Sequence, residues 1–394
     1  MKICILCTSY PRSKIDHWVT FMHSWAKELA KTEDVIVVTS GGPNTVGYEV
    51  RDKVKIFRFN YFWPKSLQKL TYSGGMRESF KHEFLPKIQV PFFMLAFLTK
   101  SVKIAKKCDV INAHWTLSGL VALPLRFLYK KPIVLTEHGG SIRGLPKWLN
   151  KFVFKRMDAI TTAHYDLQEA IKGMDIKKVV GIKNFLNEEK FLKKHNIRLI
   201  KKQLGIKNEQ IITFVGRFEE LKDPLTFVKS IVYTVKNKKN VKFIMIGDGH
   251  LREDVIKEIK NLGVEKHIVF IGPTTEVAKY LAISDIFVAC SGTENCFSTT
   301  ILEAMLSSVP CVITKAGMTE KFFKHNRYAY LVDKKSPKAL GDGITKLLSD
   351  TKLRNKLCRN GFEFLEKYGF RNKVIIKKLM KTFKEVLESQ HQFN

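Results

Sequence analysis

Acidic residues are scarce in this sequence relative to basic ones. Its 394 residues contain 37 Asp and Glu against 68 Lys and Arg, which leaves a formal net charge of +31. Such an excess predicts an anionic partner, and nucleic acid, an anionic membrane surface and a phosphate-bearing small molecule are all candidates. Since 54 of the basic residues are Lys, a genome-wide bias toward lysine explains the same excess.

Long hydrophobic runs and local cysteine clusters are also missing. The longest nearly apolar run, residues 88–98, has eleven residues including a proline, whereas a membrane-spanning helix needs about 20. The N-terminal segment becomes polar too early for a signal peptide. Seven scattered cysteines fit reduced thiols, and Cys4 and Cys7 lack a second Cys or His pair at zinc-finger distance. We therefore expect a cytoplasmic protein with no metal.

Short β-branched runs alternate along the chain with segments of helical periodicity. Seven such runs precede residue 185 and six follow residue 210, and most are apolar throughout. This pattern predicts parallel sheets covered by helices on both faces. The polar, Lys-rich segment 185–209 divides them, so the chain is predicted to be an α/β protein with two doubly wound, Rossmann-like domains facing each other across a cleft.

The predicted domains are an N-terminal acceptor-side domain at residues 1–190 and a C-terminal domain at 191–370. We expect a last helix, at 371–394, to pack back on the first domain. Ligands of such sheets bind beyond the carboxyl ends of the strands. The residues at strand ends are therefore the candidates for function.

Two cations follow the first strand of the second half. Arg217 stands at the tip of that strand and Lys222 stands just before a helix expected to begin at Pro224. A helix amino end already favours an anion, so the pair fits a clamp for a diphosphate. Either residue alone is more simply explained as a solvated surface charge.

The segment 285–314 carries two further acids. A strand ends at Cys290, a polar loop holds Glu294, and Glu303 falls in the middle of an otherwise apolar helix. Burying that carboxylate is costly unless something hydrogen-bonds it. Ribose hydroxyls would do so, and a nearby Lys or backbone amide is the alternative partner.

Two histidines end neighbouring strands in the first half. His114 follows one apolar run, and His138, followed by Gly139, follows the next. A single histidine at a strand end is more often packed than catalytic. Two at adjacent strand ends make a functional role about as probable as a structural one.

Taken in order, these motifs resemble those of the retaining group 1, family 4-like glycosyltransferases, which have the GT-B fold and use nucleotide-sugar donors. The similarity covers nearly the whole chain. It is carried by the strings SYPR, DVINAHWTLSGL, PIVLTEHGGS, VGRFEELKDP, IGDG and ENCFSTTILEAM.

The resemblance implies a role for each candidate. Arg217 and Lys222 would bind the donor diphosphate and stabilise its charge as it leaves, helped by amides around Ser298, Thr299 and Thr300. Glu303 would hold the ribose, Glu294 the sugar hydroxyls, and His138 would contact the donor sugar at the reacting centre. The base-proximal turn would be Gly272, Pro273 and Thr274, and the possible acceptor or cleft contacts are Asp16, His114 and Gly139.

The chain departs from the family pattern at two functional places. Eight residues separate Glu294 from Glu303 where the family usually has seven, so either the loop bulges or Asn295 takes the first acidic position. Ile15 and Asp16 replace the glycine pair expected after the first strand. No D-x-D motif ends a strand, which agrees with chemistry that uses side-chain cations in place of a metal.

The acceptor must be inferred from the first domain. Residues 51–107 hold thirteen basic and three acidic side chains, and 141–156 hold five basic and none acidic, with aromatic residues among them. These windows predict a peripheral site on the cytoplasmic face of a membrane and a lipid-linked or saccharide acceptor, or they line the core and the cleft. A GT-B epimerase or phosphorylase, and a non-catalytic basic nucleic-acid or membrane-binding protein, remain the alternatives. No nucleic-acid motif is visible, so no nucleic-acid partner is expected.

Overall fold

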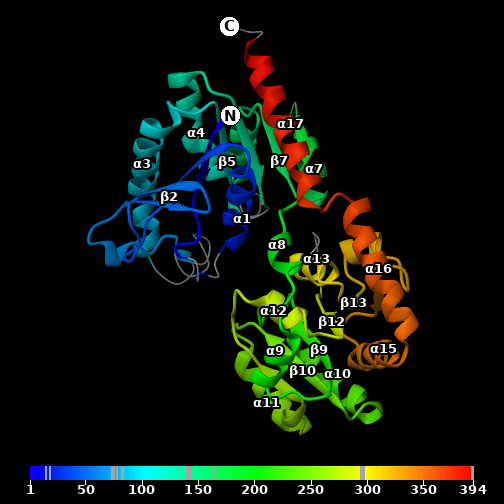
Figure 1. Cartoon of the computed structure of the whole chain (residues 1–394). Coiled ribbons are helices and arrows are strands. Elements are labelled where there is room, and N and C mark those ends of the chain that lie inside the picture. Colours follow the sequence, from blue (N-terminus) through cyan, green and yellow to red (C-terminus); the bar gives the residue numbers. More distant parts are fainter. Residues whose placement is uncertain are drawn as a thin grey trace. The chain divides into compact units, whose positions relative to one another are not determined.

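Figure 1 shows the computed structural model of the chain, which divides into two compact units. The first unit is Met1–Phe185 with Asn372–Asn394, and the second unit is Leu186–Arg371. The structure describes residues 1–391 except 14–15, 17–18, 72–75, 77–78, 81–83, 139–143, 164, 175, 177 and 293–297. Each unit is a helix-covered, mostly parallel sheet, as the alternation of apolar runs and amphipathic segments predicts.

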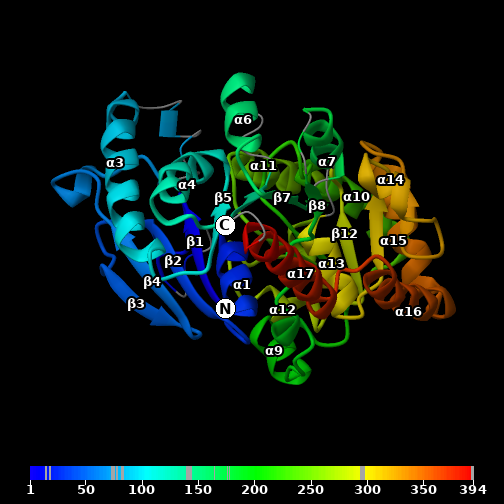
Figure 2. The same cartoon turned by 90° about the horizontal axis from the view of Figure 1, so that it is seen from above.

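The first unit is built on an eight-stranded sheet with the order β3-β4-β2-β1-β5-β6-β7-β8, and β3, β4, β2, β1 and β5 can be followed in this order in Figure 2. The central strands are buried along nearly their whole length, because helices cover both faces. The strands are β1 (Lys2–Cys7), β2 (Asp34–Ser40), β3 (Tyr48–Arg51), β4 (Val54–Phe59), β5 (Val110–His114), β6 (Ile133–Glu137), β7 (Ala159–Thr162) and β8 (Val179–Gly181).

Strand β3 corrects the sequence prediction of seven parallel strands in this half. It pairs antiparallel with β4, through a two-residue turn in which Asp52 and Lys53 have φ values of 49° and 65°. Two positive φ values are typical of the type I′ hairpin turn. The usual Asn-Gly signal is absent here and β3 is a partly exposed edge strand, so its four residues gave no apolar run to detect.

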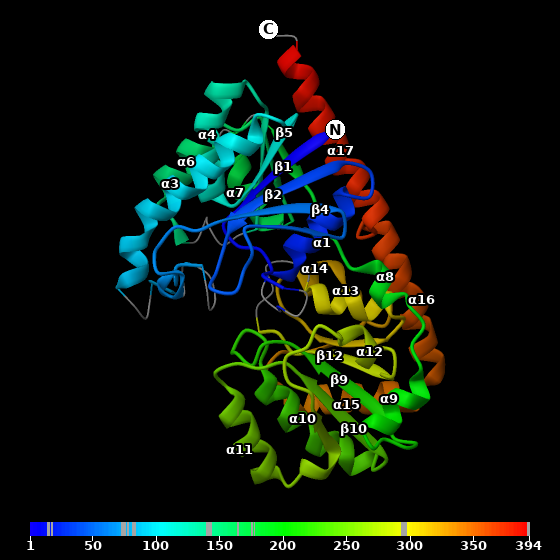
Figure 3. The same cartoon turned by 60° about the vertical axis from the view of Figure 1, so that its left-hand side comes forward.

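Two helix layers enclose this sheet, one on each face (Figure 3). One face is covered by α3, α4, α6 and α7, and the other by α1 together with the C-terminal helix α17. From α17, Leu379 and Phe383 are fully buried against Met22 and Trp25 of α1. The helices are α1 (Thr20–Leu29), α3 (Leu85–Ala105), α4 (Thr116–Tyr129), α6 (Lys147–Phe154), α7 (Tyr165–Lys172) and α17 (Asn372–His391), with a short 3-10 turn at Lys65–Leu67.

Helix α3 overturns the expectation that no segment could cross a bilayer. It has 21 residues, and by length and composition alone it is long and apolar enough to span a membrane. About 33% of its most apolar window is buried, and Phe93 and Phe97 pack in the core of the first unit. A core helix of a globular unit passes the same test, so this one helix is weak evidence for a membrane span.

The second unit contains a six-stranded parallel sheet with the order β11-β10-β9-β12-β13-β14. Its strands are β9 (Gln210–Val215), β10 (Val241–Ile246), β11 (Ile268–Phe270), β12 (Ile286–Ala289), β13 (Cys311–Thr314) and β14 (Tyr330–Val332). Its helices are α8 (Glu188–Phe191), α9 (Ile197–Gln203), α10 (Pro224–Asn237), α11 (Arg252–Leu262), α12 (Val277–Leu281), α13 (Thr299–Leu306), α14 (Met318–Phe322), α15 (Pro337–Ser349) and α16 (Thr351–Lys367), with a 3-10 turn at Glu265–His267. Helices α10, α11 and α15 cover one face, while α12 and α13 lie on the other.

Candidate functional site

The sheet of the second unit changes direction beside β9, which pairs with β10 on one side and with β12 on the other. The loops after β9 and β12 therefore leave the same edge of the sheet, where open α/β sheets bind their ligands. The two loops are joined directly, because Gly292 N donates to Leu221 O at 3.1 Å. Arg217 and Lys222 follow β9, and Glu303 lies in α13 after β12. The fold thus brings these three predicted residues to one edge.

The β9–α10 turn holds the two predicted cations. The Arg217 side chain is 66% exposed and forms an ion pair with Glu219 at 3.0 Å. Asp223 caps α10, because its carboxylate accepts hydrogen bonds from Thr226 N at 3.1 Å and from the Thr226 hydroxyl at 2.7 Å. The sequence argument credited the helix amino end with attracting an anion, but Asp223 already neutralises it. The attraction must come from Arg217 and Lys222 themselves.

Two glycines, Gly247 and Gly249, let neighbouring strand tips approach closely. Gly247 has a φ of 139°, and a Cβ there would lie 1.9 Å from Gly216 O. A Cβ on Gly249 would lie 2.4 Å from Phe218 O. Gly247 N also donates to Gly272 O at 3.1 Å. The G-D-G sequence therefore serves backbone packing, and it places the predicted base-proximal turn beside the tip of β10.

The side-chain carboxyl of Glu303 has no hydrogen-bond or ion-pair partner among the residues that the structure describes. Burial raises the pKa of its carboxyl to about 8, and the charge of Lys190 acts in the opposite direction. The Lys190 amine instead bonds to Thr275 O and to Glu276, whose Oε1 lies 3.2 Å away. Within the part of the chain that the structure describes, this carboxyl is therefore not paired to a lysine or a backbone amide. A partly buried carboxyl remains, with acceptor capacity to offer a ligand.

The start of α13 contains the predicted phosphate-binding residues. Ser298 is its N-cap residue, and the Ser298 and Thr300 hydroxyls lie 2.9 Å apart. Thr299 opens the helix. Glu294 and Asn295 lie outside the described residues, so the choice between them for the first acidic position stays a prediction.

In the first unit, the predicted histidines contact each other at the carboxyl edge. His114 Nδ1 and His138 Nε2 lie 2.9 Å apart, and the rings stack with centroids 5.1 Å apart. His114 is fully buried and His138 is partly exposed. Gly139 lies outside the described residues. Sequence reasoning noted both histidines without predicting that they form a pair.

The loop after β1 is held by two arginines that sequence reasoning missed. Arg58 donates to Pro11 O at 2.8 Å, and Arg51 donates to the carbonyls of Pro11, Arg12 and Ser13. Both arginines are at most 6% exposed. Asp16 accepts from Arg12 N at 2.9 Å, so part of its acceptor capacity serves the loop itself. The sequence does not reveal such contacts, because the partners of each arginine are backbone atoms distant in sequence.

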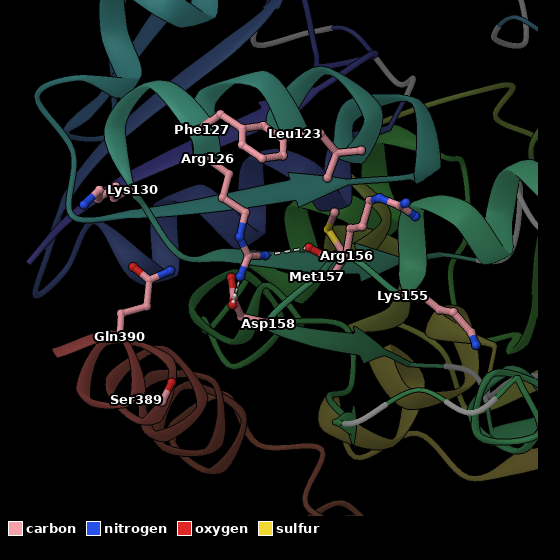
Figure 4. Close-up of a pocket in the computed structure, with 10 residues that line it drawn as sticks. All are labelled: Leu123, Arg126, Phe127, Lys130, Lys155, Arg156, Met157, Asp158, Ser389 and Gln390. Atoms are coloured by element: carbon pink, nitrogen blue, oxygen red, sulfur yellow. Dashed lines mark hydrogen bonds and ion pairs between the residues drawn. The ribbon is translucent and has the colours of Figure 1, made fainter. Parts of the chain in front are cut away.

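A basic pocket of about 750 Å³ lies at the opposite edge of the first unit's sheet, where β6 and β7 begin (Figure 4). Helices α4, α6 and α17 end beside it, and helix carboxyl ends carry partial negative charge. Lys130 and Lys155 are the C-cap residues of α4 and α6. Arg126 donates to Asp158 and to Arg156 O, each at 2.6 Å. Helix ends and Asp158 therefore account for this positive charge without a ligand.

Family models match both units of the chain. The model described as Glycosyltransferase Family 4 matches residues 19–190, and the one described as Glycosyl transferases group 1 matches residues 196–364. The chain belongs to the group 1, family 4 glycosyltransferases. Its resemblance to this family is thus confirmed, and so are the glycosyltransferase class and the α/β architecture.

Individual glycosyltransferases of known name resemble most of the chain. The N-acetyl-alpha-D-glucosaminyl L-malate synthase of Bacillus anthracis is 26% identical, over 76% of this chain and 81% of its own length. A UDP-Gal:alpha-D-GlcNAc-diphosphoundecaprenol alpha-1,3-galactosyltransferase of Escherichia coli is 26% identical over 65% of this chain and 70% of its own. The crystal structure of Anabaena HepE with UDP matches 98% of this chain and all of its own, with 18% identity and a TM-score of 0.73, which shows the GT-B fold.

Proposed function

We propose that this glycosyltransferase moves a sugar from a nucleoside diphosphate sugar, with retention at the anomeric carbon, to a lipid-linked or saccharide acceptor. The observation that carries the proposal is the edge of the second unit's sheet, where the loop that carries Arg217 and Lys222 is bonded to the loop that follows β12 and precedes the helix of Glu303. Cations suit a diphosphate, and a carboxyl without a protein partner suits the hydroxyls of a ribose. Both are needed to hold a nucleoside diphosphate.

A uridine nucleotide is the first donor to test. HepE was solved with UDP, and the name of the E. coli relative includes UDP-Gal. In this chain the Gly272-Pro273-Thr274 turn would lie near the base, because Gly272 O is hydrogen-bonded to the neighbouring strand tip at Gly247. The acceptor classes are supported by the relatives' names, one of which includes diphosphoundecaprenol and the other L-malate.

The proposed chemistry rests on charge stabilisation at the leaving group. When the anomeric C–O bond breaks, negative charge develops on the diphosphate, and Arg217 and Lys222 would stabilise it without a metal ion. The acceptor hydroxyl would attack from the face that the diphosphate leaves and pass its proton to the departing phosphate oxygen. Glu294 would hold sugar hydroxyls, and His138 would contact the donor sugar.

The outer surface of the first unit supports a membrane-bound acceptor. On α3, Ile88, Phe92 and Leu95 are 46–62% exposed at helical spacing, while the opposite side of the helix is in the core. On α6, Trp148 is 70% and Phe152 is 40% exposed. Both helices pack against α4 and so cover the same face of the sheet. The α6 segment also carries Lys147, Lys151 and Lys155. Exposed aromatic rings among lysines favour an anionic leaflet, at about 1 kcal/mol per well-placed lysine.

Vesicle flotation tests this part of the proposal. We expect the protein to float with vesicles that contain anionic lipid, less so at high salt, and not with neutral vesicles. The double change Trp148→Ser and Phe152→Ser should weaken flotation, whereas Tyr233→Ser, at a 40% exposed position in the second unit, should not. Flotation that is indifferent to lipid charge would remove the membrane proposal and leave the glycosyltransferase assignment intact.

The donor and the reaction can be tested together. Thermal-shift measurements with UDP, GDP, ADP, dTDP and CMP should show stabilisation by one nucleoside diphosphate, and mass spectrometry with the corresponding sugars should then show a glycosylated acceptor. Donor turnover to an epimer or a sugar phosphate, without any acceptor product, would favour an epimerase or phosphorylase instead.

A further inference from the structure

His138 is the end of a hydrogen-bonded row that runs across the first unit's sheet. Its Nε2 lies 2.9 Å from His114 Nδ1, and His114 Nε2 lies 3.0 Å from Asn112 Oδ1. The Asn112 amide nitrogen donates to Val134 O at 3.0 Å and to the Thr136 hydroxyl at 2.9 Å. Asn112 and His114 are both fully buried in β5. The sheet backbone therefore fixes the positions of Asn112 and His114, and with them the hydrogen-bond partners that each can reach.

The direction of every hydrogen bond in this row follows from the backbone. The carbonyl of Val134 can only accept, so the amide nitrogen of Asn112 must face it and Oδ1 must face His114. Because an amide oxygen also only accepts, His114 must carry a hydrogen on Nε2. The amide orientation and the tautomer of His114 are thus set by a main-chain atom.

The buried position of His114 determines what its other nitrogen can do. Burial, and then the neighbouring His138, hold the pKa of His114 well below its ordinary value. His114 is therefore neutral, and its Nδ1 is a hydrogen-bond acceptor. The hydrogen between the two rings must then belong to Nε2 of His138.

Aromatic neighbours hold both rings in place. The fully buried Trp25 contacts His114 and His138 edge-on, with centroids 5.3 Å and 6.1 Å away. Phe21 and Trp115 lie 4.9 Å and 5.3 Å from the His138 ring. A ring packed on several sides cannot readily turn over to exchange its nitrogens.

We propose that Asn112 and His114 are positioning residues that keep the hydrogen between the two rings on Nε2 of His138, so that Nδ1 of the uncharged ring meets a substrate hydroxyl as an acceptor. The substrate part rests on the proposed function, whereas the tautomer does not. His138 would then select a sugar that presents a hydroxyl at this point and would not act as an acid there.

Nitrogen NMR of the ¹⁵N-histidine-labelled full-length protein tests the tautomer directly, because protonated and unprotonated ring nitrogens have well-separated shifts. The His138 signals are assigned by their loss in His138→Gln. We expect protonated Nε2 and unprotonated Nδ1 on both His114 and His138 at neutral pH. A protonated Nδ1 on His138, or averaging between tautomers, would overturn the proposal without any variant being needed.

Asn112→Asp is designed to reverse the row. A carboxylate would stabilise a charged His114, whose Nδ1–H would donate to His138 Nε2 and force the hydrogen of His138 onto Nδ1. We expect reversed His138 shifts, a kcat lower by roughly 10- to 100-fold, as for other partners that fix a histidine tautomer, and little change in donor KM. If Asn112→Asp does not fold, His114→Phe serves in its place. It removes the acceptor and keeps a ring, so the His138 shifts are expected to average between the two tautomers.

Thr161→Val is the matched control. Thr161 is equally buried, and its hydroxyl lies 2.8 Å from that of Thr136 at the far end of the row. Since Asn112 keeps its bond to Val134 O, His138 shifts and kcat should remain as in the wild type. Reversed shifts in Asn112→Asp with unchanged turnover would refute the catalytic consequence of the tautomer. Normal turnover by His138→Gln would refute the role of His138 in the proposed function and leave the tautomer assignment standing.

Discussion

Replacing Glu303 by Gln should stabilise the second unit while weakening its nucleotide binding. The carboxyl sits where burial raises its pKa from the ordinary 4.5 to about 8, and no described residue bonds to it. The folded protein therefore holds the proton more tightly than the unfolded chain. Folding loses stability as pH rises from about 4.5 to 8, because the group must ionise in a poorly solvated place.

The size of the effect follows from the two pKa values. At 1.36 kcal/mol per pKa unit, the loss reaches about 3 kcal/mol at pH 7 and about 5 kcal/mol above pH 8. Gln carries no charge, so Glu303→Gln should match the wild type near pH 4.5 and exceed it by these amounts at higher pH. For a unit of this size, 3 kcal/mol corresponds to a Tm increase of roughly 6–12 °C.

The assay is thermal unfolding of both proteins between pH 5 and 9, read on the transition that responds to nucleotide. Adding the donor nucleotide should narrow the stability gap between the two proteins, because a hydrogen bond to a charged group is worth about 1.5–3 kcal/mol and Gln forms weaker ones. Glu363→Gln, an exposed acid on α16, should change neither stability nor binding measurably. Parallel pH curves for Glu303→Gln and wild type would refute the reasoning, as would equal nucleotide affinity.

Two further predictions concern the same edge of the second unit. Arg217→Ala and Lys222→Ala should each lower the transfer rate by roughly 10²- to 10³-fold with unchanged circular dichroism. The control Lys229→Ala, on the exposed side of α10, should leave the rate unchanged. Turnover near the wild-type rate in either site variant would refute the role of these cations in binding the diphosphate. Gly247→Ala should abolish nucleotide-dependent stabilisation and cost several kcal/mol, because its Cβ would collide with backbone 1.9 Å away at a φ of 139°. Gly263→Ala, which has a φ of 63° and open space around it, should cost only about 1 kcal/mol, and equal Tm losses for the two glycine variants would contradict the packing argument.

Local periodicity was sufficient to predict thirteen of the fourteen strands and the helices after β9 and β12. Apolar strands covered on both faces leave a signal in every window of sequence, and so does a helix that begins at Pro224. The positions at and after the carboxyl ends of those strands indicated the candidate residues, which are Arg217, Lys222, Glu303, His114 and His138. Strand β3 was not predicted, because an exposed edge strand needs no apolar run.

Contacts between distant segments could not be deduced in the same way. The hydrogen bonds of Arg51 and Arg58 to the loop after β1 show this, because 38 to 47 residues separate each donor from its acceptor. The length of α3 shows it too, since a helix whose Phe93 and Phe97 are in the core can carry exposed apolar residues on its other side. Such facts depend on which side of an element meets a neighbour.

The chain's own residue order was enough to determine the two α/β units, the edge of each sheet where chemistry is possible, and the family to which the protein belongs. Tertiary structure alone decided that the Glu303 carboxyl has no described partner, that the basic pocket in the first unit lies beside three helix ends, and that a backbone carbonyl orients the Asn112 amide beside His114. Periodicity is a property of each segment, whereas desolvation and hydrogen-bond direction depend on atoms brought together from different segments.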